Sequence, residues 1–167
     1  EGPRQFAVAR LSVTLFGGMA VRSARGRPVI LSRKKAQALL AYLAIRPGRP
    51  CQRDKLAALL WGDLPGEQAR HSLRQTLLDL RRALGANPSS PLVAEGDTLV
   101  LNPKGVDVDV AAFERLAMEG TPKDFEQAAS LYKGDLLEGL VLRERPFEEW
   151  LTAERERLRE LALKTLG

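Results

Sequence analysis

The chain has 167 residues, of which 44% are hydrophobic and 28% are charged, a composition typical of a globular protein with one large or two small domains. It contains no apolar run near the roughly 18–20 residues that a membrane span needs, and its first residues lack the apolar core of a signal peptide, so we expect a cytoplasmic protein with no membrane partner. Because Cys51 and His71 are the sole residues of their kinds, the sequence excludes an intrachain disulfide and gives no reason to expect a metal or another cofactor.

The charge is distributed unevenly between the two halves of the chain. Residues 1–85 contain 16 Lys and Arg against 5 Asp and Glu, a net charge of +11, whereas residues 86–167 contain 10 against 16, a net charge of −6. A strongly basic half next to an acidic one is typical of a protein in which one part binds a polyanion. A nucleic-acid interface is therefore expected in the N-terminal half.

The start of the basic half predicts short strands that are followed by a helix. Residues 1–9 are expected to form a loose leader. Alternating apolar and polar residues, interrupted by glycine-rich turns, then predict strands at 11–16, 19–22 and 28–31. Ser32 is expected to cap a helix that ends before Pro47-Gly48 and whose apolar face contains Ala36, Leu39, Leu40 and Leu43.

Residues 52–85 predict two amphipathic helices joined by the short loop 62–66. The first begins near Asp54, and its inner face contains Leu56, Leu59, Leu60 and Trp61. The second runs from Glu67 to Gly85, and its apolar stripe, opposite a polar and basic face, contains Leu73, Leu77, Leu80 and Leu84. Two helices in this arrangement are the usual device for placing side chains in the major groove of DNA.

A hairpin follows the second of these helices. Apolar strands at 92–94 and 99–101 flank the turn Glu95-Gly96-Asp97-Thr98, after a loop at 86–91. The strands before and after the three helices are too short and too few to form a parallel sheet that holds them. The pattern therefore favours an α+β winged helix-turn-helix domain over residues 10–103.

The residues after Pro103 predict helices. Apolar spacing indicates one helix that includes Val108 and ends at Gly120, another from Pro122, a loop at 134–139, and a long helix over 147–166. Paired helices of this kind are similar to tetratricopeptide-like repeats, so we expect an all-α segment over 104–167 with a core separate from the winged helix. Since such helices need neighbours to bury their faces, further C-terminal domains of the same chain are expected.

Ten side chains are candidates for contact with double-stranded DNA. Arg and Gln make paired hydrogen bonds to guanine and adenine edges, and cations near helix N-termini can meet phosphates. The alternative interpretation, solvated charges with little net effect, stays open, in particular for the basic cluster at 33–35 and for Arg53. The candidates are Arg33, Lys34, Arg53, Arg70, His71, Ser72, Arg74, Gln75, Arg81 and Arg82.

No pattern in the chain indicates an enzyme. His71 has no Ser, Cys or carboxylate constellation around it in the sequence, and Gly17-Gly18 lacks the further glycines and the lysine of a phosphate-binding loop. Cys51 is expected to be a small buried apolar residue rather than a reactive thiol. We therefore predict a protein without catalytic activity.

Several segments, taken in order, resemble one family of bacterial regulators. They are RKKAQALLAYL at 33–43, RPG at 46–48, RDKL at 53–56, LWGD at 60–63, LRRALG at 80–85, DVD at 107–109, LYKGDLL at 131–137 and ERERL at 154–158. In this order and spacing they resemble the Streptomyces antibiotic regulatory protein type of transcriptional activator, which joins an OmpR-like winged helix to a bacterial transcriptional activation domain.

That resemblance implies a place for each element on DNA. The helix at 67–84 would enter the major groove, the hairpin would lie near the minor groove, and the loop at 62–66 would face RNA polymerase. Residues 104–167 would be the opening, truncated part of the activation domain.

Three positions depart from the pattern of that family. Gln52 stands where serine is usual, so the second helix is expected to have a weak cap, and Asp79 replaces a common arginine and would repel phosphate. The hairpin tip at 95–98 replaces a Gly-Tyr-Arg type of tip. These departures leave a second hypothesis, a degenerate winged helix that acts as a protein-interaction or regulatory module in a larger multidomain signalling protein.

Overall fold

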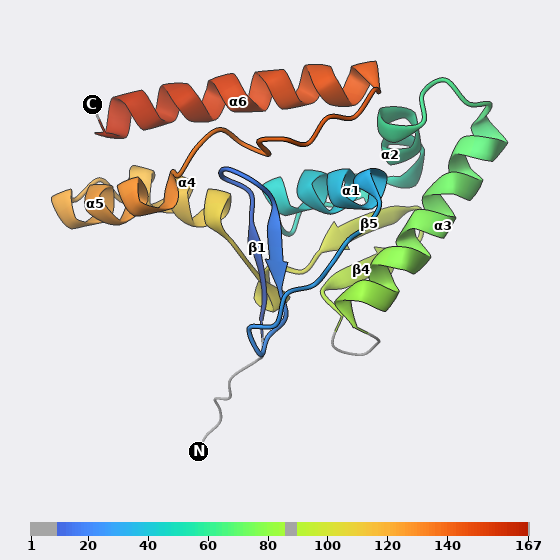
Figure 1. Ribbon diagram of the computed structural model, residues 1–167, viewed down its shortest axis with the longest axis horizontal. Helices are drawn as coiled ribbons and strands as arrows, with labels where there is room; N and C mark the ends of the chain where they lie inside the picture. Colours follow the sequence, from blue (N-terminus) through green and yellow to red (C-terminus); the bar gives the residue numbers. More distant parts are fainter. Residues whose placement is uncertain (1–9, 86–89, 167) are drawn as a thin grey trace.

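Figure 1 shows the computed structural model, which describes residues 10–85 and 90–166. The predicted leader at 1–9 and residues 86–89 of the predicted loop lie outside the described residues. Helices α1, α2 and α3 and one small sheet form the winged helix, and α4, α5 and α6 follow. Another small sheet combines two strands from the start of the chain with one that lies just before α4. Helix α3 forms one outer side of the molecule, α4 and α5 lie on the opposite side, and α6 extends across between them (Figure 1).

The first sheet consists of β1 (Leu11–Thr14), β2 (Ala20–Arg22) and β6 (Val106–Val108), in the order β2-β1-β6. Strand β2 is antiparallel to β1, and β6 is parallel to it. The strand predicted at 28–31 is wrong: Pro28 forms an isolated bridge with Arg22, and proline has no N–H with which to continue a ladder. The prediction that Val108 belongs to a helix is also wrong, because this residue ends β6.

The winged helix is built from α1 (Lys34–Ile45), α2 (Arg53–Leu60), α3 (Gly66–Leu84) and a second sheet. That sheet contains β3 (Cys51–Gln52), β4 (Leu92–Glu95) and β5 (Thr98–Leu101), in the order β3-β5-β4. The predicted cap at Ser32 is wrong, because the chain stays extended until Arg33, which precedes α1 without a side-chain cap. Instead the Nε2 of Gln37 donates a hydrogen bond of 2.6 Å to the carbonyl of Leu31.

The C-terminal part begins with a 3-10 turn, η1 (Pro103–Gly105), that leads into β6. Its helices are α4 (Asp109–Glu119), α5 (Pro122–Leu131) and α6 (Arg145–Leu166). Gly120 ends α4 in the left-handed conformation, at φ 75°, and Thr121 and Asp124 form a capping box that starts α5. Helices α4 and α5 pack against each other, and α6 contacts both α5 and α2.

One continuous core joins the two parts. The carboxylate of Asp109, at the start of α4, accepts hydrogen bonds from the backbone N–H groups of Leu15 at 2.8 Å and Phe16 at 2.9 Å. Burial raises the pKa of this carboxyl above its ordinary value. The ring of Phe113 packs edge-on against Phe16, with centroids 5.2 Å apart, and lies 5.5 Å from the ring of Tyr132. The separate cores that we expected are therefore wrong for the described residues, whereas the functional division of the chain stays a prediction.

Candidate nucleic-acid interface

Helix α3 presents a polar face to solvent along most of its length. Its buried stripe packs toward α1 and α2 and fixes which residues point outward; it consists of Ala69, Leu73, Thr76, Leu77 and Leu80. At about 100° per residue, His71, Leu78 and Arg82 lie along the centre of the opposite face. The side chain of Leu78 is 44% exposed there and could contact a thymine methyl group.

Five of the seven sequence candidates on α3 are exposed, and two are half-buried at the edges of the face. The exposed candidates are Arg70, His71, Arg74, Gln75 and Arg82, and the half-buried ones are Ser72 and Arg81. A surface hollow beside the loop between α2 and α3 brings several of them together, with a lining that includes Arg70, His71, Ser72 and Arg74. The structure thus gathers donors suited to bases and phosphates on one helix face.

At the start of α1 the three basic residues have different surroundings. Arg33 is exposed, and its Nε lies 3.7 Å from the Oδ2 of Asp79 on α3. Lys34 is exposed, whereas the Nζ of Lys35 lies 3.1 Å from the Oε2 of Glu144. Arg33 therefore offsets the negative charge of Asp79, so the repulsion that the sequence predicted at this position is weakened. Arg33 and Lys34 are the two members of the cluster at the surface.

Arg53, the first residue of α2, is half-buried. Its backbone N–H donates to the carbonyl of Asp97 at 2.8 Å and so ties α2 to the hairpin. Its side-chain Nε is buried without a hydrogen-bond partner among the described residues. The preceding Gln52 makes no side-chain hydrogen bond to the helix, which confirms the weak cap.

The hairpin formed by β4 and β5 has an acidic tip. Glu95, Gly96 and Asp97 are exposed, and the Oγ1 of Thr98 donates to the carbonyl of Glu95 at 2.8 Å. The sequence contains no Lys or Arg over residues 86–103. The tip therefore presents negative charge beside the basic helices.

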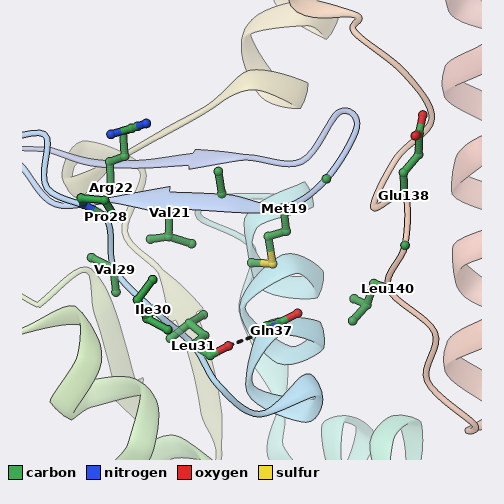
Figure 2. A pocket seen from close by; sticks show the side chains of 13 residues that line it. Met19, Val21, Arg22, Pro28, Val29, Ile30, Leu31, Gln37, Glu138 and Leu140 are labelled. Atoms are coloured by element: carbon green, nitrogen blue, oxygen red, sulfur yellow. Dashed lines mark hydrogen bonds between the residues drawn. The ribbon is translucent and has the colours of Figure 1, made fainter.

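A hollow elsewhere on the winged helix has a different character. Figure 2 shows side chains that line it between β2, α1 and the segment before α6, among them Met19, Gln37, Leu140 and the extended residues 29–31. Most are apolar, and the side chain of Arg22 points away from the hollow in Figure 2. This lining does not suit a phosphate backbone, so we assign the candidate interface to α3.

The pairing of Arg33 with Asp79 had no signal in the sequence, because Arg33 immediately precedes α1 whereas Asp79 lies within α3, 46 positions later. A second basic group, Arg46, Arg49 and Lys55, was also not predicted, although its density of charge within ten residues was a usable signal.

Over 10–85 and 90–166, no group of His, Cys, Asp and Glu is suited to hold a metal ion. In the same ranges, every helix lacks the length or the apolar character that a bilayer span requires.

Comparisons with known proteins agree with this geometry. Residues 26–95 match the family model described as "Transcriptional regulatory protein, C terminal". A search of curated proteins found no significant match. Among solved structures, Mycobacterium tuberculosis EmbR in complex with a low-affinity phosphopeptide matches with a TM-score of 0.69 and 26% identity over 93% of this chain. The present chain spans 43% of the length of that EmbR chain.

These matches confirm the predicted winged helix followed by a helical segment. Residues 26–95 are thus similar to the C-terminal domain of transcriptional regulatory proteins.

Proposed function

We propose that this chain binds double-stranded DNA in a sequence-specific manner and regulates transcription, with α3 in the major groove. The observation that carries the proposal is the exposed face of α3, along which Arg74, Gln75 and Arg82 follow one another. A helix fits the major groove, and Arg and Gln are the side chains that best distinguish guanine and adenine edges. The match of residues 26–95 to transcriptional regulators supports the same function.

Phosphate contacts would lie on either side of this base-reading face. Arg33 and Lys34 stand at the start of α1 and Arg53 at the start of α2, where the positive end of the helix dipole also favours anions. Arg70 is available as well, because its ion pair with Asp54 is long, at 4.0 Å, and solvent-exposed.

We further propose that the protein is a cytoplasmic activator of the Streptomyces antibiotic regulatory protein type. The ordered sequence segments support this assignment, as does the fold shared with EmbR over 93% of the chain. The loop at 62–66 is exposed between α2 and α3, so in a protein bound through α3 it would be available to RNA polymerase.

Fluorescence anisotropy with labelled duplexes tests the proposal. The chain is titrated against a random duplex and against genomic fragments at two salt concentrations. We expect binding to every duplex that weakens as salt rises, and at least one genomic fragment bound about tenfold or more tightly than the random duplex. Absence of binding at low salt would exclude the DNA function, and equal affinity for every duplex would exclude sequence specificity.

The acidic hairpin tip favours a second candidate function, a winged helix that acts as a protein-interaction or regulatory module. Hairpins that approach the minor groove use cations to meet its negative potential, whereas this tip carries Glu95 and Asp97. If the chain does bind DNA, the hairpin therefore contributes nothing or opposes binding. The slope of log K against log salt is then expected to be shallow, because few phosphates are contacted.

The double substitution Glu95→Lys and Asp97→Lys distinguishes the two functions. With α3 in the groove, it is expected to raise affinity for any duplex and to steepen the salt slope by about 0.9 for each added phosphate contact. The matched control is Glu119→Lys with Glu126→Lys, which makes the same change of charge on exposed positions of α4 and α5. If both double variants bind alike, the hairpin does not approach DNA and the interaction module is favoured.

A further inference from the structure

A second basic site lies where the winged helix meets α6. A hollow of about 460 Å³ is enclosed by the end of α1, by β3, by the start of α2 and by α6. Lys55 of α2 lines this hollow, whereas its neighbour Asp54 lies 4.0 Å from Arg70 of α3. The hollow therefore belongs to a different side of α2 from the face proposed to bind DNA.

Three cations line the hollow, and their charge is not cancelled locally. Arg46 has a long contact of 3.9 Å with Glu114, while Arg49 and Lys55 form no ion pair with any residue that the structure describes. The lining also contains the carboxylate of Glu154, which accepts a hydrogen bond of 2.8 Å from Arg157, a guanidinium that it shares with Glu114 at 2.6 Å. The three cations of the lining still outnumber this carboxylate. The hollow thus carries excess positive charge, which favours an anionic ligand.

Cys51 shows that part of this wall is withdrawn from water. Burial raises the pKa of its thiol in spite of the neighbouring Lys55 and Arg49. The thiol is therefore neutral and does not compensate the cations. Arg49 and Lys55 themselves are exposed, so they would meet an anion at the open side of the hollow.

Two aromatic rings complete the lining. The rings of Tyr42 and Trp150 are half-buried, lie 4.8 Å apart between centroids and are tilted by 54°. The ring of Trp150 is also packed at 5.4 Å against Phe147, which fixes its position. Rings held in this way offer a firm apolar surface for a flat group, while the cations lie at the same hollow.

We propose that this hollow binds a small organic anion that carries a flat ring, with its acid group on Arg49 and Lys55 and its ring against Trp150 and Tyr42. The volume of about 460 Å³ lies within the range of small-molecule sites, roughly 300–1,000 Å³. A nucleoside monophosphate and an aryl carboxylate both have this chemistry. Because the walls come from α1, α2 and α6, the bound molecule links the winged helix to the C-terminal helix. The proposal does not depend on DNA binding by α3.

Isothermal titration calorimetry on the 167-residue chain tests the proposal with complete and incomplete probes. The complete probes are AMP and salicylate; adenosine supplies a ring without an acid group, and ribose 5-phosphate an acid group without a flat ring. We expect at least one complete probe to bind with a Kd below about 1 mM and about tenfold or more tightly than either incomplete probe. If AMP binds and salicylate does not, the ligand is of the nucleoside monophosphate class. If salicylate binds and AMP does not, it is of the aryl carboxylate class.

Variants locate the binding on this hollow. Arg49→Gln with Lys55→Gln is expected to weaken the complete probe about tenfold or more, because both charge-assisted contacts are lost. The matched control, Arg115→Gln with Lys123→Gln, alters exposed cations on α4 and α5 and is expected to leave the Kd unchanged. Thermal melting checks that both variants fold; if the pocket variant is unfolded, the single substitutions replace it. The proposal is overturned if neither complete probe binds at 5 mM, about fivefold above the expected Kd. It is also overturned if an incomplete probe binds as tightly as the complete one, or if the hollow variant and the control variant have the same Kd for the complete probe.

Discussion

Replacing Arg74 with alanine is expected to lower the affinity for a specific duplex about 5- to 150-fold, which corresponds to roughly 1–3 kcal/mol. Arg74 is exposed on the outward face of α3, and among the described residues it makes no ion pair that would have to break on binding. Its side chain is thus available for a guanine edge or a phosphate. Arg82→Ala is expected to have a similar effect if α3 lies along the groove over its full length. Fluorescence anisotropy measures both variants.

Arg115→Ala provides the matched control for these two variants. Arg115 is exposed on α4, on the opposite side of the molecule from α3 (Figure 1), and contacts Glu119 at 3.9 Å in a surface pair of little energetic value. Its removal is expected to leave DNA affinity nearly unchanged. If Arg74→Ala and Arg82→Ala also bind normally while circular dichroism shows intact folding, α3 is not the recognition helix.

Asp109→Ala is expected to lower the free energy of unfolding by about 2–4 kcal/mol, a large share of the roughly 5–15 kcal/mol typical of a folded protein. The substitution leaves the backbone N–H groups of Leu15 and Phe16 buried without their acceptor. The loss is partly offset, because the half-buried carboxylate itself is costly to desolvate, as its raised pKa indicates. Urea denaturation measures the change.

Asp107→Ala is the natural control, because it alters the same residue type two positions earlier. Asp107 pairs with Arg10 at 2.7 Å, but its side chain is 62% exposed, so the expected loss is below about 1 kcal/mol. A loss of stability at Asp109 no greater than that at Asp107 would contradict the role of Asp109 in joining α4 to the end of β1.

The parts of the fold that the sequence predicted well are those set by local periodicity. The apolar stripe of α3, Leu73, Leu77 and Leu80, defined both the helix and the face opposite to it, so the exposed candidates followed directly. The sequence also predicted the hairpin at 92–101, because Gly96 lies in the turn between its two strands. In the structure this glycine adopts a positive φ of 56°.

The features that the sequence did not predict depend on partners far away in the chain. The three residues of β6 form a strand because β1, more than 90 positions earlier, offers an edge to them; locally they read equally well as the start of a helix. Ser32 has the right chemistry for a cap, but Arg33 occupies the cap position, and the carbonyl of Leu31 accepts a hydrogen bond from the side chain of Gln37 instead. The half-buried position of Arg53 likewise depends on the hairpin, through Asp97.

The parallel pairing of β6 with β1 has a consequence for how such a protein can be divided and recombined. A recombined protein that received the winged helix alone, cut after the hairpin, would have the edge of β1 unpaired. An open strand edge favours association with other chains. A transferred segment that keeps both sides of β1 paired must therefore include β6, together with Asp109, whose carboxylate follows it. The smallest interchangeable module is thus longer than the winged helix itself.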